Sequence, residues 1–170
     1  MTGGDTVTDE WTRSSNPARR ANLLAMDADP FDLDRFVKAQ AAGRVYEHAL
    51  RELRAGCKQS HWMWFVFPQI AGLGHSAMAQ RYAIRSLDEA RAYAAHPILG
   101  ARLRECVAAL NELATTDAGA VLGSIDAVKL RSSLTLFARA EPGERAFTRC
   151  LEHFFGGVED DATLARLRGA

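Results

Sequence analysis

CKQSHWMWFVFPQ, residues 57–69, is the stretch that decides the fold, because it holds the densest run of large apolar side chains in the chain. It contains two of the three tryptophans, Trp62 and Trp64, and two phenylalanines, Phe65 and Phe67. Each aromatic side chain buries about 150–250 Å², so we expect this aromatic segment at the middle of a core. This composition is typical of a pocket wall, and equally of a core strand or helix. The polar residues at its edges need hydrogen-bond partners if they are buried: Lys58, Ser60, His61 and Gln69.

Outside the aromatic segment, apolar residues recur every three to four positions, which is the spacing of helices. Asp32 is expected to cap the first helix and Asp161 the last one, and Ser86 with Glu89 forms a capping box at the start of another. Gly56 is expected to end the second helix. No segment alternates cleanly between polar and apolar residues, and the one candidate strand, residues 62–67, has no partner. We therefore predict an all-α fold, a single multi-helical globular domain. The predicted helices cover residues 33–40, 45–53, 77–83, 87–95, 97–113, 126–139, 143–155 and 162–167.

The helical domain is expected to span residues 29–170. Residues 1–28 are rich in Thr, Gly, Ser, Asp and Arg, and this composition predicts a disordered tail. No run approaches the roughly 18–20 apolar residues of a membrane span. The N-terminus has no apolar stretch typical of a secretion signal. We therefore expect a cytoplasmic protein.

Charge and cysteine content limit the function classes. The 21 Lys and Arg residues balance the 21 Asp and Glu residues, so a general electrostatic attraction to nucleic acid is missing. The three cysteines are far apart and imply no disulfide framework. No pair of histidines or cysteines has the spacing of a zinc site. We predict no metal, no cofactor, and no nucleic-acid or membrane partner.

The predicted helix 126–139 carries apolar residues nearly all round, which is typical of a buried helix. Lys129, Ser132 and Ser133 would then enter a packed environment, where their spacing lets their side chains meet. A buried lysine can act as a base or hold a phosphate. Alternatively, Lys129 extends outward and the serines bond to the preceding turn. We expect these polar residues to share one concavity with His61 and Gln69, because buried polar groups need partners.

Two other features bear on chemistry. His61 is the best candidate for a general acid–base, because histidine titrates near neutral pH; alternatively, it is a hydrogen-bonded core residue. The sequence from Gly72 to Ala77 matches the G-x-G-x-x-A pattern of dinucleotide-binding folds. Pro68 interrupts the preceding apolar run and no parallel strand follows, so we predict no such fold. A weaker role remains, in which backbone N–H groups of residues 74–76 bind an anion at a helix start.

The motifs DPFDLDRFVKAQ (residues 29–40), SHWMWFVFPQ (60–69), HPILGARL (96–103) and KLRSSLTLF (129–137) resemble the bacterial family called domain of unknown function 1810. The resemblance covers residues 29–167. It implies an all-helical fold and no assigned activity. Members of the family often carry the label calpastatin. A calpastatin inhibits through disordered, repeated segments, whereas this chain has a dense aromatic segment and no repeat, so the label does not suit the sequence.

A second likeness is to the helical N-glycosidases of the NADAR group, which process ribosylated nucleotide derivatives. Asp34 stands six residues before Gln40, as an acidic residue does before a glutamine in that group. The stretch from Lys129 to Phe137 is similar to a later helix of the group. The sequence departs from the pattern at Arg35, where those enzymes have a histidine. The likeness implies N-glycosidase-like hydrolysis with Asp34 as a catalytic residue.

Three hypotheses follow. The first is a small-molecule pocket enzyme, a hydrolase that acts on a nucleotide-like, ribosylated or sugar-phosphate compound. The second is a protein-interaction module that uses an aromatic patch without catalysis, with a partner that the sequence does not name. The third is a domain without a site, whose aromatic residues are only core. For the first hypothesis the catalytic candidates are His61, Asp34 and Lys129, and the binding candidates are Lys58, Ser60, Trp62, Trp64, Gln69, Ser132 and Ser133.

Overall fold

The computed structural model describes residues 29–169, and every structural statement below concerns this part of the chain. The chain divides into two compact units after Asp32. The described residues of the first unit form a turn, in which the Asp32 backbone N–H donates to the Asp29 carbonyl at 3.1 Å. The second unit begins at Leu33 and contains all the helices described below. The predicted tail, residues 1–28, lies outside the described residues.

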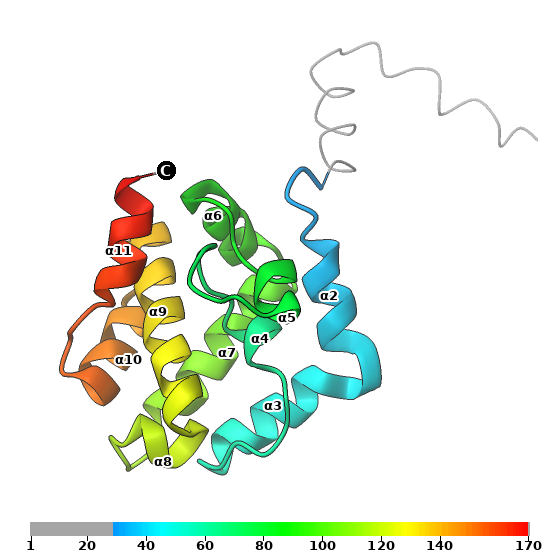
Figure 1. Cartoon of the computed structure of the whole chain (residues 1–170). Coiled ribbons are helices and arrows are strands. Elements are labelled where there is room, and N and C mark those ends of the chain that lie inside the picture. Colours follow the sequence, from blue (N-terminus) through cyan, green and yellow to red (C-terminus); the bar gives the residue numbers. More distant parts are fainter. Residues whose placement is uncertain (1–28, 170) are drawn as a thin grey trace, which may run out of the picture. The chain divides into compact units, whose positions relative to one another are not determined.

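Residues 29–169 form helices joined by turns and no strand, which confirms the all-α prediction. An isolated bridge joins Ile70 to Ile84. The candidate strand at residues 62–67 instead contains the helical turn α4, since no extended segment lies beside it to pair with. The helices in chain order (Figure 1) are α2 (Asp34–Ala41), the 3-10 helix η1 (Ala42–Arg44), α3 (Val45–Arg54), α4 (Met63–Val66), α5 (Ala77–Arg81), α6 (Leu87–Ala95), α7 (Leu99–Asn111), α8 (Ala118–Leu122), α9 (Ser124–Ala140), α10 (Arg145–Phe155) and α11 (Asp161–Arg168).

Helix α9 is the central helix of the second unit and packs against α6, α8, α10 and α11 (Figure 1). From residue 130 to residue 138, every side chain except that of Arg131 is buried. A helix with apolar residues all round requires this kind of enclosure, so the buried helix predicted here is confirmed. Its first turns differ, because Ile125 and Val128 are 73% and 62% exposed.

Local sequence signals set several helix ends as predicted. The Ser86 hydroxyl accepts a hydrogen bond from the Glu89 N–H at 3.1 Å, and α6 begins directly after it. Helix α3 is followed by Gly56, whose φ of 64° lies in the left-handed region that glycine adopts without strain. The Gly56 N–H bonds to the Leu53 carbonyl, and the next N–H bonds to the Glu52 carbonyl. These two backbone hydrogen bonds form the Schellman motif, which commonly ends helices.

Other helix ends differ from the prediction. Leu33 rather than Asp32 holds the N-cap position of α2, and Asp32 itself has a positive φ of 53°. The cap of α11 is Asp160 rather than Asp161. Helix α8 was not predicted, and the carboxylate of Asp117 caps it. Adjacent acidic residues are equally good caps, so the choice between them depends on where the preceding turn places the chain.

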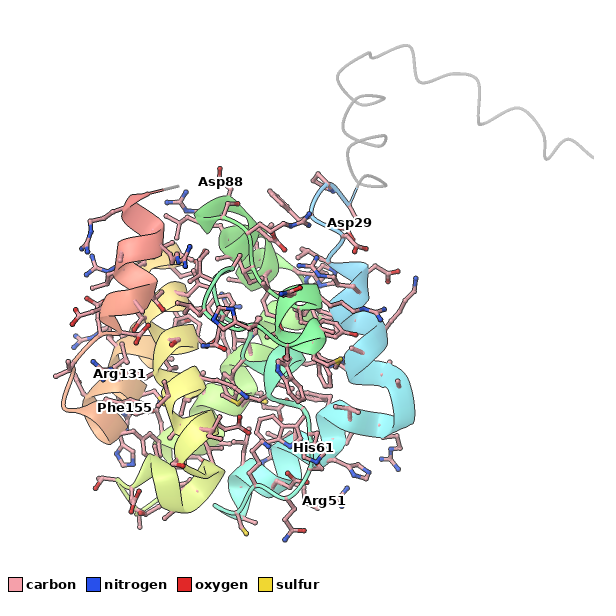
Figure 2. All side chains as sticks on the ribbon, in the orientation of Figure 1. Asp29, Arg51, His61, Asp88, Arg131 and Phe155 are labelled. Carbon is pink, nitrogen blue, oxygen red and sulfur yellow. The ribbon has the colours of Figure 1, made fainter. Side chains whose placement is uncertain are left out.

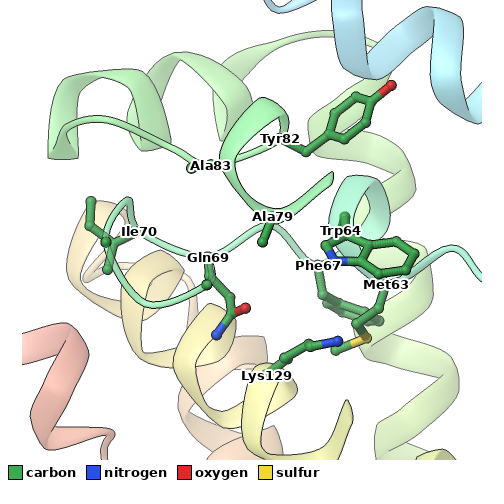
Figure 3. Close-up of a pocket in the computed structure, with 11 residues that line it drawn as sticks. Met63, Trp64, Phe67, Gln69, Ile70, Ala79, Tyr82, Ala83 and Lys129 are labelled. Carbon is green, nitrogen blue, oxygen red and sulfur yellow. The ribbon is translucent and has the colours of Figure 1, made fainter. Parts of the chain in front are cut away.

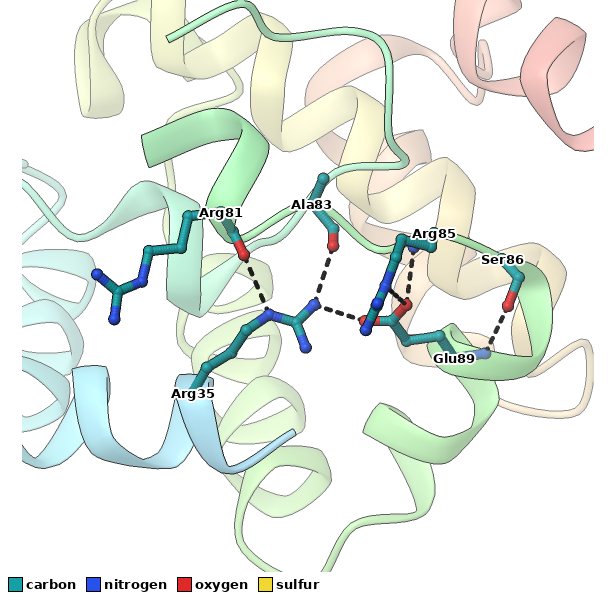
Figure 4. A network of polar contacts seen from close by, with 6 residues as sticks. All are labelled: Arg35, Arg81, Ala83, Arg85, Ser86 and Glu89. Carbon is teal, nitrogen blue, oxygen red and sulfur yellow. Dashed lines mark hydrogen bonds and ion pairs between the residues drawn. The ribbon is translucent and has the colours of Figure 1, made fainter. Parts of the chain in front are cut away.

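A buried ion pair that the sequence analysis did not anticipate joins α2, α5 and α6 (Figure 4). Glu89 is fully buried, and its carboxylate lies 2.5 Å from the guanidinium of Arg35. The same guanidinium donates to the carbonyl of Arg81, the last residue of α5, and to that of Ala83, two residues beyond it. Arg85 donates to the other carboxylate oxygen from its backbone N–H and its side chain. Glu89 was expected to complete a capping box, but its carboxylate instead pairs with both of these arginines.

The aromatic segment is held in the core through its backbone as well as its side chains, which fill the space between the helices (Figure 2). The Phe65 carbonyl accepts hydrogen bonds from Gln40 at 2.8 Å and from the Tyr93 hydroxyl at 3.1 Å. The rings of Phe65 and Tyr82 meet edge to face at 5.2 Å, and those of Phe36 and Tyr93 at 5.0 Å. Helices α2, α5 and α6 therefore fix the position of α4.

Candidate functional site

The turn that carries Lys58 and His61 is held by one carboxylate, that of Glu52 on α3. Glu52 accepts hydrogen bonds from the backbone N–H groups of Gln59 and Ser60, from the Ser60 hydroxyl at 2.6 Å and from the Trp62 indole N–H at 2.7 Å. Burial acts to raise the pKa of Glu52, but these hydrogen bonds to the charged form outweigh it and lower the pKa to about 2. The charged form of Glu52 is therefore part of the folded structure.

This arrangement predicts an acid-sensitive contribution of Glu52 to stability. The folded pKa of about 2 lies below the ordinary 4.5. The contribution should thus be complete above about pH 4.5 and disappear as the pH falls toward about 2. We expect the difference in urea midpoint between the native chain and Glu52→Gln to narrow over this range. Glu47→Gln, an exposed change on the same helix, is the control. A difference that stays constant with pH would contradict the assignment.

The most concentrated charge cluster in this region joins Lys58, Asp126 and Lys129. Each lysine ammonium lies 2.8 Å from a different oxygen of the Asp126 carboxylate. The side chains of the three residues are only 9%, 17% and 23% exposed, in the same order. Burial acts to raise the pKa of Asp126, and the hydrogen bonds and charges of the two lysines outweigh it and lower the pKa. Two positive charges and one negative charge leave this cluster with a net charge of +1.

Both ammonium groups also lie over indole rings. The Lys129 nitrogen is 5.0 Å from the centre of the Trp64 ring, and the Lys58 nitrogen is 5.1 Å from that of Trp62. At such distances the ring face attracts a cation. An ammonium has three N–H donors, and Lys129 uses one of them, on Asp126, within residues 29–169. Two donors of Lys129 are therefore available to a ligand or to water.

The charge cluster and Trp64 line an open pocket of about 400 Å³ between the aromatic segment and the start of α9. Small-molecule sites in proteins fall in the range of about 300–1,000 Å³, so the volume suits a compact ligand. Its polar lining comes from the charge cluster and from His61, which is exposed (Figure 2). Ile125 and Trp64 supply apolar surface.

A closed cavity lies on the other side of Trp64 and Lys129, which line both spaces. Its volume of about 10 Å³ is about that of one water molecule. Figure 3 shows the Gln69 amide and the Lys129 side chain directed into the same region from the loop and from α9. Phe67 and Tyr82 complete the aromatic part of its wall. We refer to these two spaces as the open pocket and the closed cavity.

Five predicted site residues meet around the two spaces: Lys58, His61, Trp64, Gln69 and Lys129. This meeting agrees with the expectation that Lys129 would lie beside the aromatic segment, although 71 positions (129 − 58) separate the two lysines. Two further candidates support the turn beneath. Trp62 is 1% exposed and donates to Glu52, and Ser60 does the same from its hydroxyl. The roles of all these residues in binding or catalysis remain predictions.

The other candidates lie elsewhere. Asp34 is on an exposed face of α2, where it pairs with Lys38 at 2.5 Å, and it lines neither space. Ser132 faces α11, because its hydroxyl donates to the Val128 carbonyl and to Asp160. Ser133 is fully buried, and its hydroxyl has no hydrogen-bond partner within residues 29–169. The prediction of one shared concavity is therefore wrong: His61 lines the open pocket, Gln69 lines the closed cavity, and neither Ser132 nor Ser133 lines either space.

Two residues of the site were missing from the predicted set, Asp126 and Glu52. Asp126 stands three positions before Lys129, a spacing at which an acid and a base on a helix meet, so the sequence held a signal for it. Glu52 offers no such signal. It reads as an ordinary surface residue of a helix, and its partners follow on a turn whose path depends on the packing of α4.

The part of the chain that the structure describes holds no group of three or more His, Cys, Asp or Glu side chains arranged to bind a metal ion. In the same residues, no helix is both long enough and apolar enough to cross a bilayer.

The fold and these two spaces define an all-helical domain with a cationic pocket beside an aromatic core. A family model described as Protein of unknown function (DUF1810) matches residues 30–167, and the chain belongs to this family. The predicted membership is confirmed. The chain is similar to the conserved hypothetical protein Rv1873 from Mycobacterium tuberculosis, whose crystal structure is known. The two sequences are 51% identical, and the structures match with a TM-score of 0.80 over 82% of this chain and 99% of that chain. No curated protein shows a significant match to the chain.

Proposed function

We propose that the open pocket binds a small anionic compound of the nucleotide or sugar-phosphate type. The observation that carries this proposal is the sharing of one carboxylate, Asp126, by two lysines at 2.8 Å each. One carboxylate cannot neutralise two ammonium groups, so a positive charge remains inside a partly buried pocket. A ligand phosphate or carboxylate would balance this charge and accept hydrogen bonds from the remaining N–H groups of Lys129.

The residues around the charge cluster favour a ligand that carries a sugar or a ring as well as an anionic group. The open pocket, at about 400 Å³, is far larger than a phosphate group. Trp64 is half-buried and offers a flat apolar face beside Lys129. A sugar or a ring attached to the anion would cover this face and Ile125, which is 73% exposed at the pocket. Ligand binding is thus the part of the first hypothesis that the geometry supports best.

Hydrolysis of an N-glycosidic bond stays a prediction. Asp126 is the carboxylate of the open pocket, and both of its oxygens already accept hydrogen bonds from lysines, which makes it a weak base. His61 lies at the pocket edge and is the remaining proton donor or acceptor. Incubation of the protein with a nucleoside monophosphate, followed by an assay for free base and ribose 5-phosphate, tests this step. Product formation that requires His61 would support a hydrolase.

A protein-interaction role is the second candidate function, in a changed form. The aromatic patch that it requires is inside the domain, since Trp62 is 1% exposed and Phe67 is 1% exposed. The two most exposed of the large apolar side chains within residues 29–169 are Ile125 and Val128, one helical turn apart on α9. A pair of adjacent exposed apolar residues is a smaller surface than stable interfaces bury. We therefore rank this role below ligand binding.

Lys129→Met tests the proposed ligand site, because methionine keeps much of the side-chain length and removes the charge. A hydrogen bond to a charged group contributes about 1.5–3 kcal/mol, so we expect the Kd for ribose 5-phosphate to rise at least about tenfold. The fold should persist, since Asp126 retains Lys58. Calorimetry measures the Kd, and thermal unfolding reports ligand stabilisation.

Lys38→Met is the matched control, because Lys38 is an exposed lysine on α2 that lines neither space. It should leave the Kd unchanged. Equal Kd values for the native chain and Lys129→Met would show that Lys129 does not bind the ligand, and would contradict the proposed site. Binding that is equally strong at low and high salt would also contradict an ammonium as the main anchor.

A further inference from the structure

The segment of residues 71–83 forms a cover over the closed cavity. Its two ends are joined, because the Ala71 N–H donates to the Ile84 carbonyl at 2.8 Å and the Ile84 N–H donates to the Gln69 carbonyl at 2.9 Å. Between these ends the chain makes the loop of residues 72–76 and helix α5. Both parts of this covering segment line the cavity, with Gly74 from the loop and Ala79 from α5.

The closed cavity has two unlike walls (Figure 3). One wall is aromatic and includes Trp64 and Phe67. The covering segment contributes Tyr82 and four of the smallest residues: Gly72, Gly74, Ala79 and Ala83. Aromatic side chains beside small residues are suited to a flat ring. Gln69 lies at the edge of this space, where its amide offers both a donor and an acceptor.

The two ends of the covering segment are held differently. At the C-terminal end of α5 the covering segment is bound firmly. Arg35, which forms the buried ion pair with Glu89, also donates to the carbonyls of Arg81 and Ala83. The loop of residues 72–76 is bound to the domain beyond the covering segment by one exposed hydrogen bond, from Arg166 to the Gly72 carbonyl at 3.0 Å. Its last two residues are tied to α5, because the Ser76 hydroxyl accepts from the Ala79 N–H and the His75 carbonyl accepts from the Gln80 amide. Residues 72–74 can therefore move outward while α5 stays in place.

We propose that the closed cavity is a slot for the flat ring of the ligand whose anionic group binds in the open pocket. This inference rests on the proposed function. The ligand class is a nucleoside monophosphate. Its phosphate lies against Lys58 and Lys129, its sugar passes Trp64, and its base enters the slot with a carbonyl or amino edge on Gln69. Because the slot has room for only about one water molecule, residues 72–74 of the loop move outward when the base enters.

The test compares three probes by calorimetry: inorganic phosphate, ribose 5-phosphate and the corresponding nucleoside 5′-monophosphate. A base that enters the slot should lower the Kd at least about tenfold relative to ribose 5-phosphate, which corresponds to about 1.4 kcal/mol. Equal Kd values for these two probes would overturn the slot and leave the proposed function standing. Failure of all three probes to bind would overturn both proposals.

Two variants make the test specific to the slot. Ala83→Leu fills it and should bring the ratio of the two Kd values close to one, whereas Ala101→Leu, at an exposed alanine on α7, should keep the native ratio. Arg166→Met removes the hydrogen bond that holds the loop. It should speed association of the nucleoside monophosphate several-fold, and Arg168→Met, at an exposed arginine on the same helix, should not. A native ratio of Kd values in Ala83→Leu, together with a native association rate in Arg166→Met, would overturn the slot.

Discussion

Glu89→Ala is expected to destabilise the folded chain by about 3–5 kcal/mol, because it breaks a buried ion pair by removing one partner. The Glu89 side chain is fully buried, and its carboxylate contacts Arg35 at 2.5 Å and Arg85 at 3.1 Å. Removal of this carboxylate leaves positive charge in an environment of low polarity. It also loosens the junction of α2, α5 and α6 (Figure 4). Urea unfolding should show a lower midpoint with an unchanged slope.

Asp88→Ala is the matched control on the neighbouring position. Asp88 is 76% exposed and pairs with Arg91 on the surface of α6, where ion pairs contribute about 0–1 kcal/mol. The double variant Arg35→Met with Glu89→Leu removes both charges and should be more stable than the sum of the single changes predicts. A cost for Glu89→Ala as small as that of Asp88→Ala would show that the pair is not buried in solution.

Trp62→Ala should cost about 3–5 kcal/mol, the usual loss when a large aromatic side chain is removed from a core. Trp62 is 1% exposed, contacts Phe67 at 6.3 Å between ring centres, and donates to Glu52. Trp64→Ala should cost clearly less, because Trp64 is half-buried between the two ligand spaces. The comparison of urea midpoints for the two variants measures this difference directly.

Trp62→Phe separates the two contributions of Trp62. It retains most of the apolar contact and removes the indole N–H that donates to Glu52 at 2.7 Å. The cost should be intermediate, and the acid sensitivity due to Glu52 should weaken, since one of the hydrogen bonds that lower its pKa is gone. Equal losses for Trp62→Ala and Trp64→Ala, or a larger loss for Trp64→Ala, would contradict this account of the core.

Much of the helix pattern could be predicted because helical hydrogen bonds join residues only four apart. The capping serine Ser86 and the glycine Gly56 act on the helix next to them, and both stand where the structure has helix ends. Helix α8 escaped prediction since its five residues are too short for a periodic pattern. Residues 62–67 escaped it because apolar runs of that length suit a strand as well as a helical turn.

The candidate site could be predicted in part. Apolar surroundings and polar side chains together predicted that Lys129 would approach the aromatic segment, and it lies over Trp64. The same argument failed for Ser132 and Ser133, because neither lines the open pocket or the closed cavity. Ser132 faces Asp160 on the side of α11. Asp34 matched a pattern of spacing, but spacing alone does not say which face of α2 meets the core.

The sequence by itself determined the helical class through local periodicity, and the central place of the aromatic segment through composition. It indicated the family through motifs that resemble those of its members. Only the tertiary structure decided which charges meet. Asp126 lies between two lysines, Glu52 holds the turn before α4, and Glu89 is buried against Arg35. Lys58 is far from Asp126 in the chain, as Arg35 is from Glu89, and the energies of such pairs depend on distance and burial. Neither quantity exists until the helices have packed.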